Sequence, residues 1–292
     1  MSTNEPPVWL ITGCSSGLGA SLCTLISQSR SHRLIATARN PSTLSYLPQK
    51  SPNILTLALD VTSPSSISTA FSTGLSHFGR IDYVVNNAGY GIFAEAEGTE
   101  EEDARGMFET NFWGSAKVAL EAVRVFREGI FSGRGGILIQ VSSLLGRVAG
   151  GGQTYYSASK FAIEGFIEAL SKELHPKWNI RILIAEPGAI KSTAFNANIL
   201  AQREIHPAYS DPDCPTNKTR QWLAKPNLEE DFTPVDEMAR TLFEAVAKKG
   251  LSFRVPLGQD SWEAIYADVS EGLETLKGCR TLSERPSKQI QH

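Results

Sequence analysis

Short apolar runs alternate with longer amphipathic segments along most of the chain. Apolar runs rich in Val, Ile and Leu are typical of strands that are buried on both faces. The segments between them repeat their apolar positions with a helical period, which indicates helices with one buried face. Such an alternation predicts βαβ units around a parallel sheet, and therefore an α/β fold.

The pattern places each expected element by its residue numbers. Strands are expected at 8–12, 33–38, 54–59, 81–85, 136–141, 180–185 and 251–255. Helices are expected at 18–28, 63–78, 100–127, 156–174, 235–248 and 260–276. Residues 189–232 lack either period and are rich in Pro, Asn and Asp. A connection of this length is usually functional, so we expect a substrate lid at about 190–232 within a single catalytic domain, 1–282, followed by a tail, 283–292.

Composition and charge exclude several classes of function. The chain has 292 residues, of which 41% are apolar and 20% charged, and its formal net charge is -3 without a long run of one sign. We expect no nucleic acid partner and no anionic membrane surface. No apolar stretch approaches the roughly 18 residues of a membrane span. Residues 1–7 lack a secretory signal pattern, and the four cysteines lack metal spacing, so we expect a cytoplasmic protein with reduced thiols and no metal.

A glycine-rich turn lies between the first expected strand and the first expected helix. It reads T-G-C-S-S-G-L-G from Thr12 to Gly19. Glycines at this position let the backbone approach a pyrophosphate, and the following helix N-terminus offers unpaired N–H groups to the anion. A glycine-rich turn alone is a weak signal, but its place after the first strand favours a dinucleotide site. The candidate residues are Gly13, Ser15, Ser16, Gly17, Leu18 and Gly19.

The end of the second expected strand indicates which dinucleotide binds. A site for NAD usually has an Asp or Glu there, whereas this chain has Arg39. An arginine can grip a 2′-phosphate through paired hydrogen bonds, which favours NADP(H), although a plain surface arginine is the alternative. Farther on, Asp60 with Val61 is placed to contact adenine, unless Asp60 only caps the next turn. In the run Asn86-Asn87-Ala88-Gly89 we expect the last three residues near the adenosine ribose and a structural role for Asn86.

Tyr156 and Lys160 carry the clearest catalytic signal. They are four residues apart on an expected helix, so both lie on one face. A lysine ammonium beside a phenol favours the phenolate and lowers its pKa, which makes the tyrosine a usable general acid and base. This spacing is common on helices, but Ser143 at the end of the fifth strand supplies a hydroxyl that can hold a substrate carbonyl near Tyr156.

Taken together, these motifs resemble the short-chain dehydrogenase/reductase family. The match covers about residues 8–193 and includes Thr12 to Gly19, the Asn86 to Gly89 run, Ser143, Tyr156 with Lys160, and Pro187-Gly188. The resemblance implies a Rossmann-like, doubly wound parallel sheet in a three-layer αβα arrangement. It also implies a catalytic tetrad in which Asn111 joins Ser143, Tyr156 and Lys160 by holding a water for proton relay. Without it, Asn111 would be a packing or helix-kink residue.

Further cofactor contacts and the substrate class are implied by the same resemblance. Pro187, Gly188, Ile190 and Ser192 are expected near the nicotinamide, although the family often has Thr where this chain has Ser192, with Thr193 next. The sequences of several segments resemble most those of the 17β-hydroxysteroid and retinol dehydrogenase branch. This resemblance implies a hydrophobic alcohol or carbonyl substrate. Three glycines at 150–152 replace bulkier residues that often touch substrate, so a roomy or flexible pocket is expected.

We therefore expect an NADP(H)-dependent oxidoreductase that interconverts a carbonyl and an alcohol on a small steroid-, retinoid- or polyketide-like substrate. The alternatives are a non-redox cyclase or isomerase, and a nucleotide-sensing protein, on the same scaffold. The expected helices at 100–127 and 156–174 carry more apolar residues than one buried face requires. In the resembling family these helices usually join subunits, so a homodimer or homotetramer is expected, with a monomer as the alternative.

Overall fold

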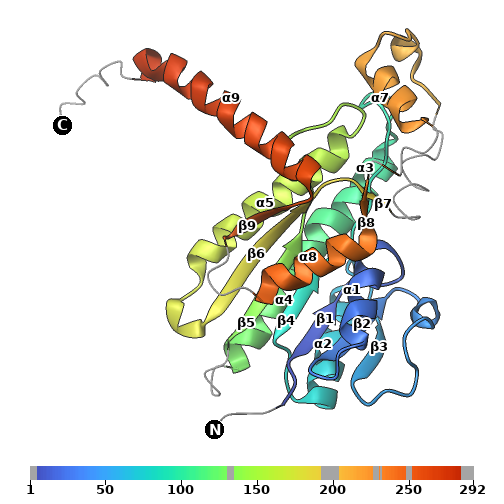
Figure 1. Ribbon diagram of the computed structural model, residues 1–292, viewed down its shortest axis with the longest axis vertical. Coiled ribbons are helices and arrows are strands. Elements are labelled where there is room, and N and C mark those ends of the chain that lie inside the picture. Colours follow the sequence, from blue (N-terminus) through green and yellow to red (C-terminus); the bar gives the residue numbers. More distant parts are fainter. Residues whose placement is uncertain are drawn as a thin grey trace.

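The computed structural model describes residues 5–129, 135–191, 204–225, 230, 232–247 and 252–283. In this part of the chain a seven-stranded, all-parallel sheet runs in the order β3-β2-β1-β4-β5-β6-β9 (Figure 1). The strands are β1 (Val8–Ile11), β2 (Arg33–Ala38), β3 (Ile54–Ala58), β4 (Tyr83–Asn86), β5 (Gly136–Val141), β6 (Ile180–Pro187) and β9 (Arg254–Leu257). The strand order reverses between β1 and β4, and such switch points place ligands at the carboxyl ends of the strands.

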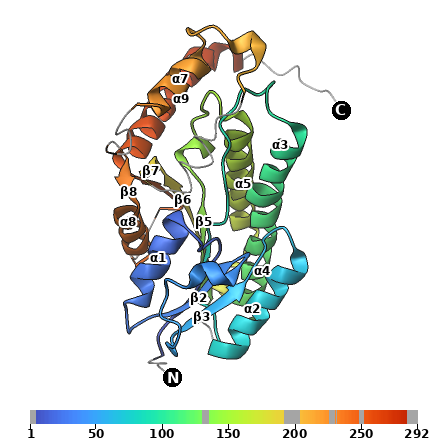
Figure 2. The same cartoon turned by 90° about the vertical axis from the view of Figure 1, so that its right-hand side faces the viewer.

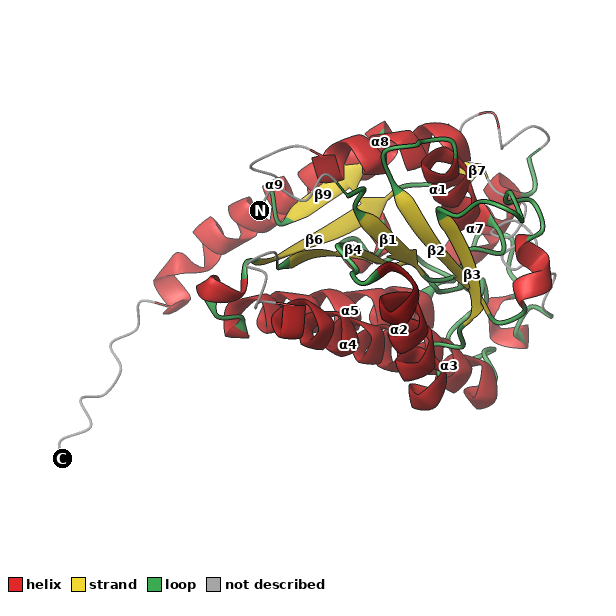
Figure 3. Cartoon of the chain, turned by 90° about the horizontal axis from the view of Figure 1, so that it is seen from below, coloured by secondary structure: helices red, strands yellow, loops and turns green. Residues whose placement is uncertain are grey.

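Helices cover both faces of this sheet (Figure 3). One layer contains α1 (Gly17–Ser27) and α8 (Val235–Ala247), which pack against each other. The other contains α2 (Pro64–Phe78), α4 (Ser115–Glu128) and α5 (Thr154–Glu173). The expected doubly wound, three-layer Rossmann-like fold is therefore confirmed. Among the helices of the described residues, none is both long and apolar enough to cross a membrane.

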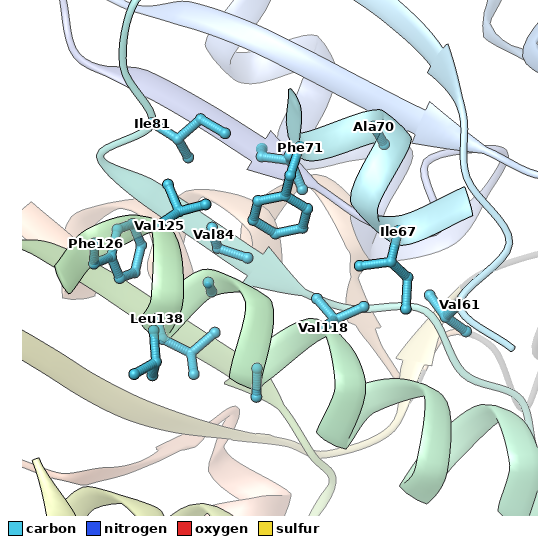
Figure 4. Close-up of a cluster of buried hydrophobic side chains, with 14 of the residues drawn as sticks. Val61, Ile67, Ala70, Phe71, Ile81, Val84, Val118, Val125, Phe126 and Leu138 are labelled. Carbon is cyan, nitrogen blue, oxygen red and sulfur yellow. The ribbon is translucent and has the colours of Figure 1, made fainter. Parts of the chain in front are cut away.

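Two hydrophobic cores hold the layers together, one on each side of the sheet. The first joins the sheet to α2, α4 and α5, with Phe71, Phe126 and Ile163 fully buried (Figure 4). The second joins it to α1 and α8 through Leu22, Ile26 and other buried side chains. Because the central strands are covered on both faces, their continuous apolar sequences are explained.

Local sequence signals fix the ends of α2. Ser63 precedes the helix, and its hydroxyl accepts a hydrogen bond from the Ser66 amide at 3.3 Å. Pro64 occupies the first turn, where a missing N–H costs nothing. The helix ends at Gly79, whose φ of 72° lies in the left-handed region that glycine tolerates.

The helix expected at 100–127 is divided in the structure. It consists of α3 (Glu101–Phe108), a π-helical turn (Glu109–Gly114) and α4. A Cβ on Gly114 would lie 2.8 Å from a methyl carbon of Val61, so this glycine lets the turn pack closely on the loop after β3. The apolar period continues through the turn, which is why the sequence pattern predicts one uninterrupted helix.

The C-terminal third also departs from the expected elements. Within 190–232 the structure contains β7 (Ile190–Lys191) and α7 (Pro215–Leu223), and β7 pairs with β8 (Thr233–Pro234). The strand expected at 251–255 is β9, displaced toward the C-terminus because it pairs with the end of β6. The last helix, α9 (Gln259–Ser283), continues past the expected end at 276, where its apolar pattern stops but its helical backbone does not. Residues 284–292 of the expected tail lie outside the described residues.

Candidate active site

The turn between β1 and α1 has the backbone that a pyrophosphate-binding loop requires. Gly13 and Gly17 have φ angles of 70° and 58°, in the region that glycine adopts without strain. A Cβ on Gly19 would lie 2.5 Å from the Gly13 carbonyl oxygen, so a side chain there would force α1 away from the turn. Ser15 is exposed beside it, and Leu18 is buried in the core below.

The first turn of α1 is suited to an anion. Ser16 stands at the N-cap position, but its side chain makes no capping hydrogen bond, and the first turn holds no acidic residue. The first N–H groups of a helix have no partners inside it, and the helix dipole favours negative charge at this end. The residues present therefore fit the pyrophosphate of a dinucleotide.

Thr12 connects this turn to the loop after β4. Its hydroxyl oxygen accepts hydrogen bonds from the backbone amides of Asn87 at 2.9 Å and Ala88 at 3.0 Å. The Asn87 side chain donates in return to the Thr12 carbonyl at 2.8 Å. Sequence reasoning assigned no role to Thr12. A structural role was expected for Asn86. The Asn86 side chain is buried and donates a hydrogen bond to Gln140 of β5 at 2.7 Å.

Arg39 and Asp60 lie near each other beyond the ends of β2 and β3. Arg39 is exposed. Asp60 accepts hydrogen bonds from the Thr62 amide at 2.9 Å and the Thr62 hydroxyl at 2.8 Å. These bonds are the main reason that the pKa of Asp60 lies below its ordinary value, and the charge of Arg39 contributes to the same shift. The turn-capping alternative for Asp60 is thus present in the structure, while its contact with adenine stays a prediction. Val61 is buried.

The end of β6 brings Pro187 and Gly188 beside the start of α9. The Gly188 amide donates to the Leu257 carbonyl at 2.9 Å, and a Cβ on Gly188 would collide with the carboxylate of Asp260. Asp260 accepts a 2.6 Å hydrogen bond from the Ala189 amide. Ile190 pairs with Thr233 in the small β7-β8 sheet. Ser192 and Thr193 lie outside the described residues.

Tyr156, Lys160 and Ser143 meet at the carboxyl end of β5. The Lys160 Nζ lies 5.7 Å from the centre of the Tyr156 ring and donates to the Val141 carbonyl at 3.2 Å. The Ser143 hydroxyl lies close enough to the Tyr156 phenol to lower its pKa. Gly91 packs against the Tyr156 ring, because a Cβ on Gly91 would lie 3.1 Å from it. The three side chains expected to act together are therefore adjacent.

Asn111 lies in the π-helical turn and connects two parts of the site. Its amide group accepts from the Tyr90 N–H at 3.0 Å and donates to the Tyr90 carbonyl at 2.8 Å. It also donates to the Ser159 hydroxyl on α5 at 3.1 Å. Gly89 lies close to both Asn111 and Lys160, because a Cβ on it would lie 3.0 Å from Asn111 Oδ1 and 3.5 Å from Lys160 Nζ. π turns of this kind are frequent at functional sites.

Burial shifts the pKa values of the two titratable groups in opposite directions. The pKa of Tyr156 is raised by burial, against a smaller opposing effect of the Ser143 hydroxyl. The pKa of Lys160 is lowered to about 8, also by burial, against the attraction of the Glu164 carboxylate. Burial and Ser143 account for this shift of the Tyr156 pKa, so the expected lowering by Lys160 stays a prediction.

Comparison with known proteins identifies the family to which this chain belongs. The short chain dehydrogenase family matches residues 7–204. The chain belongs to the short-chain dehydrogenase/reductase family. The oxidoreductase calM of Penicillium decumbens is 39% identical over 289 residues, covering 97% of this chain and 94% of that protein. A 3-ketodihydrosphingosine reductase of Bacteroides thetaiotaomicron is 34% identical over 66% of this chain and 67% of that protein.

Solved short-chain dehydrogenases share the fold of this family member. One from Streptomyces avermitilis superposes with a TM-score of 0.81 at 28% identity, covering 96% of this chain and 98% of its own. Another, from Burkholderia cenocepacia and solved in complex with NADP, has a TM-score of 0.68 at 23% identity, with coverage of 97% and 99%. Other structural neighbours are complexed with NADP or NAD.

This short-chain dehydrogenase/reductase has a buried charge cluster directly behind Lys160. Glu164, one helical turn farther along α5, accepts a 2.6 Å hydrogen bond from the Ser142 hydroxyl. It also pairs with Arg254 of β9, whose guanidinium reaches Glu186 of β6 at 3.1 Å and Glu168 at 3.0 Å. Burial raises the pKa of Glu164 to about 7, opposed by Ser142 and Arg254. Sequence reasoning missed Glu164, although its i,i+4 spacing from Lys160 was a usable signal.

A second buried ion pair ties the segment expected to be a lid to the loop after β4. The two terminal nitrogens of the Arg220 guanidinium, on α7, donate hydrogen bonds to the Glu95 carboxylate at 2.6 and 3.0 Å. The Glu95 side chain is fully buried. The same guanidinium lies 5.2 Å from the centre of the Phe93 ring. Figure 2 shows α7 at the end of the molecule where the strands end. Residues 190–232 contain five large apolar side chains that could meet a hydrophobic substrate. Tyr209 and Trp222 are among the described residues, whereas Phe195, Ile199 and Leu200 are not.

Proposed function

We propose that this short-chain dehydrogenase/reductase is an NADP(H)-dependent oxidoreductase that interconverts a ketone or aldehyde and the corresponding alcohol. The observation that supports it most is the position of Tyr156. Its phenol lies beside the Ser143 side chain and one helical turn from Lys160, at the carboxyl end of the sheet. Three groups suited to proton transfer and carbonyl binding are thereby within reach of one another.

In the reducing direction, the protonated phenol of Tyr156 acts as general acid. A bound NADP(H) would supply the hydride that reduces the carbonyl carbon, and NADP+ would accept it when the alcohol is oxidised. Tyr156 gives its proton to the carbonyl oxygen as the C=O bond becomes C–OH, and it takes that proton back when the alcohol is oxidised. Ser143 donates a hydrogen bond to the same oxygen, and the Lys160 ammonium stabilises the phenolate left behind.

The cofactor would be held across the switch point of the sheet. The amides at Gly17 to Gly19 would bind the pyrophosphate, and the exposed Arg39 would pair with the 2′-phosphate that distinguishes NADP from NAD. The adenosine half of the cofactor would be lined by Asp60, Val61, Asn87, Ala88 and Gly89. The nicotinamide half would be lined by Pro187, Gly188, Ile190 and Ser192. The base at the end of β2, with no carboxylate beside it in the Ala36 to Asn40 segment, supports the preference for NADP(H).

The proposed substrate is a small hydrophobic carbonyl or alcohol. Apolar side chains adjoin the catalytic phenol, since Ile92, Ala94 and Met107 form a small buried cluster against which Tyr155 and Tyr156 pack. The likeness to a protein named 3-ketodihydrosphingosine reductase supports a ketone on a largely apolar molecule. Steroid-, retinoid- and polyketide-like carbonyls fit this description equally.

NADPH consumption with a panel of hydrophobic ketones and aldehydes tests this function, with Tyr156→Phe as the critical variant. The variant keeps the ring that packs on Gly91 but lacks the proton, so we expect turnover to fall by at least about 100-fold while NADPH affinity is nearly unchanged. Tyr155→Phe, which alters the neighbouring phenol, is the matched control and should keep its activity. Full reductase activity in Tyr156→Phe would refute the proposed role. A wild type that binds NADPH but consumes none with any carbonyl would favour the sensing or non-redox alternative.

A further inference from the structure

Among the described residues, the hydrogen bonds and buried side chains that fix the last helix to the sheet lie at its start. Asp260 accepts from the Ala189 amide, the Ser261 hydroxyl donates to the Glu186 carbonyl at 2.7 Å, and the Ile265 side chain is buried. From Tyr266 to Arg280 every side chain is exposed. Figures 1 and 3 show this part of α9 leaving the body of the molecule. A helix with so little packing is marginal in water, because most helical stability in proteins comes from a buried face.

The exposed part of α9 nevertheless carries an apolar face. Its large apolar side chains are between 50% and 71% exposed, and they are Trp262, Tyr266, Val269, Leu273 and Leu276. Their spacing is four, three, four and three residues. Such a heptad spacing keeps one stripe facing a partner helix, as in two-stranded helix packing. We call these five residues the α9 stripe.

Charges along α9 indicate what the partner is. Acidic side chains occupy most of the helix at Glu263, Asp268, Glu271 and Glu274, whereas basic side chains occupy its end at Lys277 and Arg280. Lys277 also pairs with Glu274 of its own helix at 2.7 Å. A parallel pair of such helices would place like charges side by side. An antiparallel pair would set the acidic part of each helix against the basic end of the other. The helix is therefore complementary to a second copy of itself in the antiparallel direction.

We propose that the α9 stripe pairs antiparallel with the α9 stripe of a second copy of this chain. The heptad spacing allows a register in which the two-fold axis lies at the level of Glu271, and the opposite charges of Glu263 and Lys277 favour it. Val269 lies opposite Leu273 of the partner subunit, and Tyr266 lies opposite Leu276 of the partner subunit. Trp262 meets the guanidinium of Arg280 of the partner subunit, and Glu263 meets Lys277 of the partner subunit. The contact is isologous, so it closes as a dimer.

Length and charge distinguish this contact from other uses of the stripe. From Trp262 to Leu276 the seam is about 21 Å long at 1.5 Å per residue. A seam this short predicts association in the micromolar range, because small interfaces are weak. Helices that lie in membrane surfaces carry Lys and Arg on their polar face, whereas the α9 stripe is flanked by Asp268, Glu271 and Glu274.

Sedimentation of the full-length protein between about 1 and 100 µM tests the pairing. Leu273→Glu places a charge in the middle of the seam, and we expect it to halve the mass of the assembly and raise the dissociation constant by at least about 100-fold. Thr275→Glu adds the same charge to the same helix outside the stripe and should leave the mass unchanged. Equal masses for wild type and Leu273→Glu would overturn the proposal, as would a monomeric wild type at 100 µM. A monomer that floats with phosphatidylcholine vesicles would assign the stripe to lipid instead.

Thiol oxidation tests the orientation. In the proposed register Ser270 lies beside the two-fold axis, so Ser270→Cys, in a chain that also carries Cys279→Ser, should form a covalent dimer on oxidation. Glu271→Cys in the same background faces outward and should not. The exposed Cys279 lies about 24 Å along the helix axis from its copy in an antiparallel pair, but at the same level as its copy in a parallel pair. A covalent dimer of the wild type through Cys279 would contradict the antiparallel arrangement.

Discussion

At the scale of single residues, Lys160 and Glu164 form a coupled pair in a low-dielectric site. Burial lowers the pKa of Lys160 to about 8, and the Glu164 carboxylate one turn away opposes that shift. The other groups facing Glu164 are Arg254 of β9 and Glu186 of β6. Because the ammonium is the form that stabilises a phenolate on Tyr156, the activity should decline as pH rises through the pKa of Lys160.

Replacing Glu164 should therefore move this decline. Glu164→Gln keeps the shape and the hydrogen bond from Ser142 but removes the negative charge, so the pKa of Lys160 should fall further below about 8. We expect the alkaline limb of the pH–rate profile to shift to lower pH, with a several-fold loss of turnover at pH 8. Glu168→Gln is the control, because Glu168 pairs with the same Arg254 from the surface. Superimposable profiles for the wild type and Glu164→Gln would show that the carboxylate does not act through Lys160.

Arg39 is the residue on which the choice of nucleotide depends. Loss of its charge-assisted hydrogen bonds to a 2′-phosphate should cost about 1.5–3 kcal/mol, which raises the dissociation constant of NADPH about 10- to 100-fold. NADH has no such phosphate, so its affinity should not change in Arg39→Ala. Arg30→Ala removes an exposed arginine before β2, at the opposite end of the sheet, and should alter neither affinity. Equal affinities of the wild-type protein for NADH and NADPH would rule out this role for Arg39.

At the scale of elements, α7 and the loop after β4 are held together by one buried ion pair. We propose that 190–232 is a lid over the substrate, and the Arg220–Glu95 pair is its contact with the site's outer loop. A lid excludes water from hydride transfer and closes on binding. Cleavage within 190–232 should therefore be fast in the free enzyme and slow with NADPH and a substrate analogue. Equal protection in both states would leave this segment as static packing.

The ion pair gives the lid a specific test. Arg220→Ala leaves the Glu95 carboxylate buried without its cation, at a cost of about 3–5 kcal/mol against the docked position of α7. We expect faster cleavage between 204 and 225 and a higher KM, with the core as stable as in the wild type. Lys218→Ala removes an exposed ion pair between this helix and Asp213, which precedes it, and should behave like the wild type. Identical cleavage rates for both variants would show that the Arg220–Glu95 pair does not hold the segment.

At the scale of the whole molecule, two apolar surfaces stay exposed on the helices that the structure describes. Besides the α9 stripe, Trp113, Leu120 and Phe161 are between 44% and 51% exposed on the π turn, α4 and α5. The core side of the same helices is formed by Val118, Val123, Phe126, Ile167 and Leu170, which are buried. We propose that the exposed residues form a second two-fold contact. A chain with two isologous surfaces assembles as a tetramer when both are used and as a dimer when only one is.

Sequence alone predicted the layered fold and the proximity of Tyr156, Lys160 and Ser143. Strand runs, helical periods and the glycines of the first turn are local patterns, and local sterics and burial give them the same meaning in any chain. For this reason the strand positions and the neighbourhood of Tyr156, Lys160 and Ser143 were predictable. The roles of the individual site residues stay predictions until they are measured.

Only the tertiary structure decided which distant groups meet. Glu164 pairs with Arg254 from 90 residues away, and Glu95 pairs with Arg220 from 125 residues away. No sequence period encodes such pairs, because they depend on how β4, α5, α7 and β9 are placed around the sheet. The π turn at Asn111 and the exposure of the α9 stripe have the same origin. Both follow from which surfaces the fold brings into contact, and an apolar residue has the same letter whether it is buried or exposed.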